Sequence, residues 1–262
     1  MNEVEPGAPL DITEFYDALA PEYDTMTGFQ NRFVQEKPFF RLLVQKYDIR
    51  KALDAGCGTG FHSLLLAQLG VQMTAVDISP AMIVEARRHS QQMSIPIKAV
   101  ERSLANLRGL ADSPFDAVFS LGNTIAHILS NDELQLICGN FFGILRPQGI
   151  LLLQLLNYDR ILAGKERVQS VKEIDGKTFV RFYDYNNDSL SFNILTIDRT
   201  GGGARQSMKT VQLKPLGSAD LISRLASTGF SDIRLYGGIS MDDYIPQTSK
   251  DLVVLARRPQ SE

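Results

Sequence analysis

The chain has 262 residues, of which 44% are hydrophobic and 22% are charged, as in a globular protein with one large domain or one domain with an insertion. Its net charge of −3 disfavours a nucleic-acid-binding surface, and the absence of a long apolar run or a basic-then-apolar leader disfavours a membrane span or a secretion signal. The only cysteines are Cys57 and Cys138, so we expect a cytoplasmic protein with no structural disulfide and no metal site.

The N-terminal fifth of the chain has the pattern of helices. Residues 1–10 are rich in proline and glycine and are expected to be a loose leader. Asp11 is a candidate N-cap, and Pro21 lies between two Tyr-Asp pairs, which predicts two short helices. A further helix is expected from about residue 35 to residue 46, with a proline in its first turn.

From residue 51 onward, short apolar runs alternate with helical periodicity. The expected strands are 52–55, 72–77, 97–101, 117–121 and 150–155, and the expected helices are 60–69, 80–91 and 132–144. Ser79-Pro80 is typical of a helix start. This alternation predicts an α/β fold with a doubly wound, mostly parallel sheet.

Between residues 165 and 214 the pattern changes to alternating apolar and polar residues. Four segments, 168–174, 178–186, 190–198 and 204–213, are separated by turn-forming pairs or triplets. They predict a small antiparallel sheet inserted into the main one, which a helix at 219–228 and strands at 233–236 and 252–256 would complete. We therefore expect an N-terminal helical lid (1–50), a core (51–164 and 215–259) and a substrate cap (165–214).

The glycine-rich stretch Leu53–Gly60 joins a predicted strand to a predicted helix, where glycines allow close approach of the backbone to a ligand. A nicotinamide dinucleotide and S-adenosylmethionine are both possible ligands. The dinucleotide fingerprint requires a third glycine where this chain has Phe61. Asp77 ends the second strand, in position to accept hydrogen bonds from ribose hydroxyls. The spacing favours S-adenosylmethionine.

The assembled motifs resemble the class I S-adenosylmethionine-dependent methyltransferases. The motifs are Leu53–Gly60, Val76–Ser79 with Met82, Phe115–Val118 and Leu145–Gly149. The resemblance implies a Rossmann-like seven-stranded sheet, S-adenosyl-L-methionine as cofactor and S-adenosyl-L-homocysteine as product. The cofactor-binding residues that it implies are Asp54, Ala55, Gly56, Cys57, Gly58 and Gly60 in the loop, Asp77 for the ribose, Ile78 and Met82 for the adenine, and Ser103, Leu104 and Leu121 after later strands.

The same resemblance assigns a role to the N-terminal helices, which fold over the cofactor in this family. A tyrosine and an arginine there hold the methionine carboxylate. Tyr23 and Arg32 are the expected pair, with Tyr16 as the second tyrosine and Arg41 as the rival arginine.

The loop after the fourth predicted strand is similar to that of the glycine N-methyltransferase group. The pattern is Leu-Gly-Asn followed four residues later by His127. Asn123 is a candidate to orient an amine. His127 is a candidate proton acceptor, or alternatively a helix cap or a buried structural group. Tyr16 completes the candidate catalytic set. The candidate substrate-binding residues are Asn123, Leu156, Asn157, Tyr158, Tyr183, Tyr185 and Tyr244.

Leu156 departs from the pattern of that group, which has an arginine here to bind the carboxylate of glycine. We therefore expect a small-molecule amine other than glycine as the methyl acceptor. The alternatives are an O- or C-methyltransferase of a hydrophobic metabolite and a cofactor-binding protein without turnover. The sequence predicts neither a nucleic-acid nor a membrane partner, and it does not distinguish a monomer from a homo-oligomer.

Overall fold

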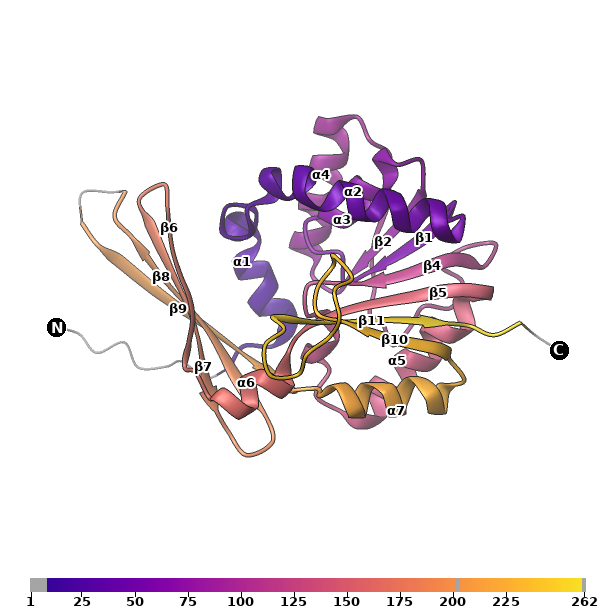
Figure 1. The fold of residues 1–262 in the computed structure, drawn as a ribbon. Coiled ribbons are helices and arrows are strands. Elements are labelled where there is room, and N and C mark those ends of the chain that lie inside the picture. Colours follow the sequence, from indigo (N-terminus) through magenta and orange to yellow (C-terminus); the bar gives the residue numbers. More distant parts are fainter. Residues whose placement is uncertain (1–8, 201–202, 261–262) are drawn as a thin grey trace.

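The computed structural model describes residues 9–200 and 203–260 and has a central sheet of seven strands (Figure 1). The strands are β1 (Lys51–Ala55), β2 (Gln72–Asp77), β3 (Lys98–Glu101), β4 (Phe115–Ser120), β5 (Leu145–Leu156), β10 (Ser231–Tyr236) and β11 (Asp251–Arg257). Their order is β10-β11-β5-β4-β1-β2-β3, and β11 alone runs antiparallel to its neighbours. The predicted fold class is confirmed. Of the predicted leader, residues 1–8 lie outside the described part of the chain.

Helices cover both faces of this sheet, because its strands are apolar on both sides. On one face lie α2 (Phe29–Tyr47), α3 (Phe61–Gln68) and α4 (Pro80–Met93), and on the other lie α5 (Asn131–Ile144) and α7 (Ser218–Thr228). The predicted N-cap Ser79 accepts a hydrogen bond from the backbone N–H of Met82, and Pro80 begins α4.

The N-terminal segment differs from the prediction of two short helices. A single helix, α1 (Ile12–Thr27), continues through Pro21, and the side chain of Asp11 caps its start. An internal proline costs a helix about 3 kcal/mol. Burial of Phe15 and Leu19, which are almost inaccessible to solvent, offsets that cost.

The next helix also begins earlier than predicted. Gly28 has φ 74° and ends α1, and α2 follows at once in a new direction (Figure 1), so Pro38 lies inside the helix and not in its first turn. The reason is aromatic packing. The rings of Phe29 and Phe33 lie 5.5 Å and 4.8 Å from that of Phe61, which extends the buried face of α2 towards its N-terminus.

A second sheet stands beside the first, with α1 between the two (Figure 1). It is an antiparallel meander of β6 (Val168–Ile174), β7 (Lys177–Tyr185), β8 (Leu190–Asp198) and β9 (Arg205–Leu213), as predicted. A short helix that the sequence did not predict, α6 (Tyr158–Gly164), connects β5 to this sheet.

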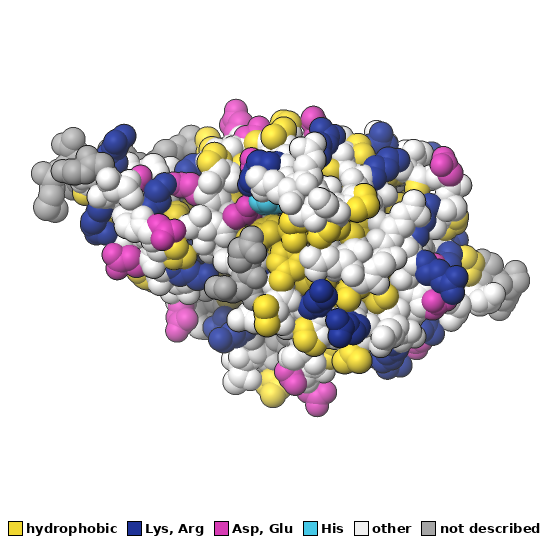
Figure 2. Space-filling model, turned by 90° about the horizontal axis from the view of Figure 1, so that it is seen from above, with side chains coloured by type: hydrophobic (Ala, Val, Ile, Leu, Met, Phe, Trp, Pro, Cys, Tyr) yellow, Lys and Arg dark blue, Asp and Glu magenta, His cyan; other side chains and the backbone are white. Residues whose placement is uncertain are grey.

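The strand order reverses at β1, so the loops that follow β1 and β4 diverge there. Such a point in an open α/β sheet forms a crevice for ligands. The glycine-rich loop follows β1, and the 3₁₀ helix η1 (Thr124–His127) follows β4. Viewed from above, hydrophobic side chains gather in the middle of the molecule, among charged side chains of both signs (Figure 2). No helix in residues 9–200 and 203–260 is long and apolar enough to cross a membrane.

Candidate active site

The backbone of the glycine-rich loop between β1 and α3 lines a cavity. Gly56, Gly58 and Gly60 have φ values of 81°, 54° and 87°, which glycine adopts without strain. The N–H groups of Gly56 and Cys57 donate to one carbonyl of β2, at 2.8 and 2.9 Å. A Cβ atom on Gly56 would overlap the side chain of Thr124 in η1. Only glycine allows this approach of the loop to η1.

Asp77, the last residue of β2, lies under the loop. Its carboxylate accepts the backbone N–H of Gly58 at 2.8 Å and that of Ser79 at 3.0 Å. Burial raises the pKa of this carboxyl, and the backbone hydrogen bonds partly offset that effect. A carboxylate has about four acceptor positions, so Asp77 keeps capacity for a ligand hydroxyl.

The cavity beside this loop, here called the first cavity, has a volume of about 180 Å³. The loop and the residues that follow β2, β3 and β4 form the wall on the side of the central sheet, and residues of α1 and α2 form the opposite wall. Its lining includes Tyr16, Tyr23, Arg32, Gly56, Cys57, Gly58, Asp77, Ile78, Arg102, Ser103, Leu104, Leu121 and His127.

A second cavity, of about 290 Å³, lies between the core and the second sheet. Its lining includes Phe15 and Leu19 of α1, Gln154, Leu156 and Asp251 of the core, and Lys172, Arg181, Tyr183 and Phe192 of the second sheet. The two cavities share Tyr16, Tyr23, Thr27, Arg32, Gly122 and His127. Two ligands bound in them would therefore meet at these residues.

Tyr16 and His127 form a hydrogen-bonded pair at that boundary. The Tyr16 hydroxyl lies 2.8 Å from Nε2 of His127. Burial lowers the pKa of His127 to about 4 and raises that of Tyr16 well above its usual value, so both are neutral near pH 7. Nδ1 of His127 is buried and makes no hydrogen bond to any described residue.

Arg32 extends from α2 to the boundary between the cavities. Its Nε donates to Glu36 at 2.7 Å, its Nη2 lies 3.1 Å from Nε2 of His62, and its guanidinium stacks on the ring of Phe61. Burial raises the pKa of Glu36, but hydrogen bonds and charge interactions with His62 and Arg32 outweigh it and hold the pKa below its usual value. The guanidinium is thus held in a fixed orientation towards the cavities.

Comparison with known proteins identifies this architecture. Residues 52–149 match the methyltransferase domain family. The glycine/sarcosine N-methyltransferase of Aphanothece halophytica is 28% identical over 226 residues, which cover 86% of this chain and 82% of that protein. The chain is a class I S-adenosylmethionine-dependent methyltransferase. Alignments of the methyltransferase with further glycine/sarcosine N-methyltransferases cover 26% to 56% of those proteins.

Two other relatives of the methyltransferase bear on its fold and chemistry. The CcbJ methyltransferase of Streptomyces caelestis has the same fold, with a TM-score of 0.81 over 95% of this chain and all of that chain, at 22% identity. A ubiquinone biosynthesis O-methyltransferase of Xanthomonas campestris is 35% identical over 109 residues, which cover 41% of this chain and 43% of that protein.

The methyltransferase uses S-adenosylmethionine, and the residues of the first cavity fit this cofactor. Asp77 has free acceptor positions for ribose hydroxyls, and the glycines expose backbone without side chains. Of the predicted cofactor residues, ten line the first cavity: Tyr23, Arg32, Gly56, Cys57, Gly58, Asp77, Ile78, Ser103, Leu104 and Leu121. Arg41, the rival arginine, is exposed and lines neither cavity.

Four predicted cofactor residues, Asp54, Ala55, Gly60 and Met82, do not line the first cavity. Asp54 is buried and accepts a hydrogen bond from Ser63 at 2.6 Å. Gly60 precedes α3, where a Cβ atom would lie 3.0 Å from that of Ala86. Ala55 and Met82 are fully buried. Each of these four residues contacts or packs against other parts of the protein, and none of them lines the cavity.

Among the predicted substrate residues of the methyltransferase, Asn123, Leu156 and Tyr183 line the second cavity, and Asn157, Tyr158, Tyr185 and Tyr244 do not. Asn157 donates to the carbonyls of Pro246 and Ser249 and accepts from the Tyr244 hydroxyl at 2.7 Å. These contacts hold the loop before β11. The Tyr185 hydroxyl donates to a backbone carbonyl near α6.

The amide of Asn123 is occupied by protein partners. Its Oδ1 accepts the backbone N–H of Leu156 at 3.1 Å, and its amide also bonds with the hydroxyl of Tyr158. Asn123 has φ 74°, which asparagine tolerates better than most residues. These bonds join the loop after β4 to the end of β5, so the side chain positions the wall of the second cavity.

Three charged residues of the second cavity were not predicted: Lys172, Arg181 and Asp251. The sequence did contain a pattern that indicates an inward-facing Arg181. In the alternating strand β7 an arginine stands between Phe179 and Tyr183, both of which face inward. Asp251 begins β11 beside the end of β5, and burial raises the pKa of its carboxyl.

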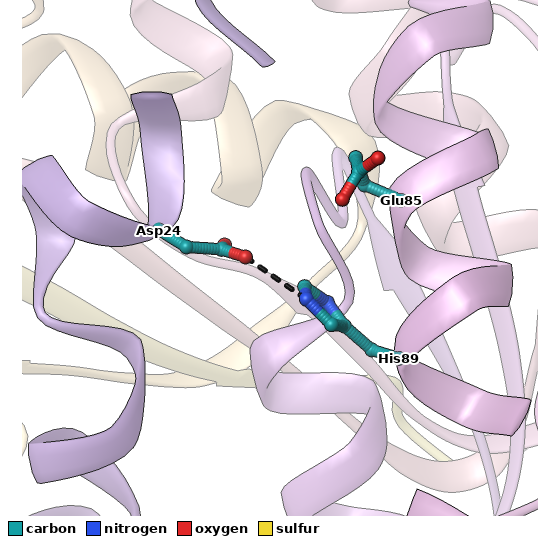
Figure 3. A group of neighbouring side chains, drawn as sticks. All are labelled: Asp24, Glu85 and His89. Atoms are coloured by element: carbon teal, nitrogen blue, oxygen red, sulfur yellow. Dashed lines mark ion pairs between the residues drawn. The ribbon is translucent and has the colours of Figure 1, made fainter. Parts of the chain in front are cut away.

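A cluster of Asp24, Glu85 and His89 joins α1 to α4 outside both cavities (Figure 3). Oδ2 of Asp24 lies 2.9 Å from Nε2 of His89, and its Oδ1 accepts the Thr59 hydroxyl. Nδ1 of His89 lies 2.9 Å from the carbonyl oxygen of Thr59 in the glycine-rich loop. Arg88 forms an ion pair with Glu85 and supplies the local positive charge. The cluster therefore fastens α1 to the core.

Proposed function

We propose that the enzyme transfers the methyl group of S-adenosylmethionine to an amine nitrogen of a small molecule other than glycine. The cofactor supplies a methyl group bound to a positively charged sulfur. The nitrogen forms a bond to the methyl carbon as the carbon–sulfur bond breaks, and the nitrogen then loses a proton. The protein has to align the two ligands and exclude water.

In this proposal the first cavity binds the cofactor. Asp77 accepts hydrogen bonds from the ribose, Ile78 and Leu104 flank the adenine, and Tyr23 and Arg32 hold the methionine carboxylate. Both cavities are lined by Tyr16 and His127, which supports a position for the acceptor nitrogen next to this pair. Helices α1 and α2 would act as the lid, and the second sheet as the cap over the acceptor.

The buried, hydrogen-bonded pair of Tyr16 and His127 supports the choice of an amine, because burial lowers the pKa of His127 to about 4. A neutral imidazole of such low basicity cannot remove the proton of an alcohol to a useful extent. An alkylamine loses its proton to water near neutral pH often enough to react, and it needs only a hydrogen-bond acceptor. Tyr16 and His127 provide one at the boundary between the two cavities.

The glycine/sarcosine N-methyltransferase of A. halophytica supports nitrogen as the target. Leu156 argues against glycine, because an apolar side chain cannot neutralise a carboxylate at that place. The second cavity, at about 290 Å³, is also larger than glycine fills. Oxygen remains the second candidate, favoured by the similarity to the ubiquinone biosynthesis O-methyltransferase.

The test is methyl transfer from S-adenosylmethionine with an isotopically labelled methyl group to panels of amines, alcohols and phenols. We expect labelled product from amines, with the label on nitrogen by mass spectrometry and NMR. Labelled oxygen or carbon would contradict the proposal. Cofactor binding by calorimetry without product from any acceptor class would indicate a non-catalytic protein. The variant Asp77→Ala, which should not bind the cofactor, is the negative control.

A further inference from the structure

The inward face of the second sheet carries two cations in a row of apolar side chains. In β7 the alternating positions Phe179, Arg181 and Tyr183 point to the same side, and the flanking pair is almost completely buried. Lys172 of β6 pairs with Phe179 in the register, so it lies on the same face and diagonally beside Arg181. Both cations line the second cavity.

Neither cation forms an ion pair within the described part of the chain. Arg181 contacts the carbonyl oxygen of Met26 at 3.5 Å, and Lys172 contacts the same oxygen at 3.4 Å, both at or near the limit of a hydrogen bond. Burial lowers the pKa of Lys172, and the nearby charges of Arg181 and Arg32 lower it further. Three cations therefore meet here, and only Arg32 has a carboxylate partner.

Such an arrangement is costly for the protein alone. Like charges that lie close together repel, and the half-buried Arg181 has no counter-ion to offset its partial desolvation, whereas Lys172 is exposed. At the C-terminal end of α1 each cation makes one long contact with the carbonyl oxygen of Met26, which leaves most of the donor groups of Arg181 and Lys172 free for a ligand. The charges are directed into a cavity that is open to a ligand.

We propose that the acceptor carries an anionic oxygen group, a carboxylate or a phosphate, that binds Arg181 and Lys172 in the second cavity, and that its amine lies beside Tyr16 and His127. This inference rests on the proposed function. It also explains Leu156: the positive charge for the acceptor comes from the second sheet and not from the end of β5. The acceptor is therefore an amine that carries an anionic group and is larger than glycine, in keeping with a cavity of about 290 Å³.

The test measures binding and turnover separately. Protein saturated with S-adenosyl-L-homocysteine is titrated calorimetrically with ω-amino carboxylic acids and aminoalkyl phosphates of increasing chain length, and with the matching methyl esters and amino alcohols. We expect the anionic members to bind at least about tenfold more tightly than their neutral counterparts, as charged hydrogen bonds imply. Equal binding of the two sets, or no binding of any anionic member, would overturn the inference.

The variants Arg181→Met and Lys172→Met should remove this preference. The matched control is Arg205→Met, because Arg205 is an exposed arginine of the same sheet that lines neither cavity. Thermal unfolding of Arg181→Met should occur at the same or a higher temperature, because an unpaired, half-buried charge is removed. A retained preference in Arg181→Met would contradict the inference.

The same variants separate an acceptor site from a cofactor site. Arg181→Met should leave the affinity for S-adenosyl-L-homocysteine within about twofold of the wild type. A loss of tenfold or more would assign Arg181 to the methionine carboxylate and overturn the inference. The methyl-transfer assay reports independently on the proposed function. Oxygen methylation of anionic acceptors would refute the proposal of an amine nitrogen as target and support the anionic group. Nitrogen methylation of neutral acceptors only would support the amine nitrogen and refute the anionic group.

Discussion

At the scale of single residues, the contact of Gly56 with η1 gives a sharp prediction. Gly56→Ala combines a backbone in the left-handed region with an overlap against Thr124, so we expect loss of cofactor binding and a destabilisation of more than about 2 kcal/mol. The measurements are calorimetric titration with S-adenosyl-L-homocysteine and chemical unfolding. The matched control is Gly28→Ala. Gly28 has φ 74° and open space around it, so that variant should show only the backbone strain.

His127 makes stability depend on pH. Its pKa is about 4 in the folded protein and 6.5 in an ordinary environment, so between these values the unfolded chain binds more protons than the folded one. Stability therefore falls as pH decreases from 6.5 to 4, by about 3 kcal/mol from this residue. In His127→Gln this part of the loss should disappear. Urea unfolding of both proteins at pH 7, 5.5 and 4.5 measures the difference, and parallel pH curves would contradict the assignment.

The individual residues also mark where sequence reasoning ends. Asp77 and the glycines were predicted because their chemistry depends on position along one strand and its loop. Asn157 and Tyr244 matched a family pattern, but their side chains bond to each other and hold the loop before β11. A motif records that a residue is present, and the partner of its side chain depends on contacts between distant segments.

At the scale of elements, the attachment of α1 to α4 predicts an effect of pH on the opening of α1. The hydrogen bond with Asp24 raises the pKa of His89 above 6.5, against the effect of burial. A raised pKa means that the stabilisation is complete below pH 6.5 and is lost as the pH rises through the folded value. Hydrogen exchange of the α1 amides should therefore become faster, relative to α5, as the pH rises from 6 to 8.5, after correction for the intrinsic pH dependence of exchange.

The variant His89→Gln tests this attachment directly. The amide can still bond to Asp24 but carries no charge, so the pH dependence of α1 exchange should be absent. The control is Lys37→Gln, which removes a cation of α2 that bonds to Gln68 away from the cluster. A pH dependence that persists in His89→Gln would show that another group controls α1.

The helices and strands of the core were predictable because each buries a stripe or a face whose period is visible in the sequence. The N-terminal helices were not. Pro21 indicated a break, yet α1 passes through it because Phe15 and Leu19 pack on the second sheet, more than 150 residues away in the chain. Local propensity was overridden by contacts that the sequence pattern does not reveal.

At the scale of the whole molecule, the composition and alternation predicted both sheets, and the position of one relative to the other was open. The relative position of the two sheets determines which residues line the second cavity. Lys172 and Arg181 come from the second sheet, Leu156 and Asp251 from the core, and Phe15 from α1. No short-range pattern relates these segments. The first cavity, lined by residues at neighbouring strand ends, was therefore largely predictable, and the second cavity was not.

Helix α1 contacts the second sheet and α4 and lines both cavities. We therefore expect it to couple the two cavities. Its Phe15 is fully buried against Phe179 and Ile194 of the second sheet, while Tyr16 and Tyr23 line both cavities. Binding of S-adenosyl-L-homocysteine in the first cavity should slow hydrogen exchange in α1 and, through α1, in β8. In Phe15→Ala, which loses about 3–5 kcal/mol of packing, protection should be confined to the glycine-rich loop and its neighbours. The control Leu42→Ala alters an exposed side chain of α2 and should keep the protection of β8. Protection of β8 that survives in Phe15→Ala would mean that the core transmits the effect by another route.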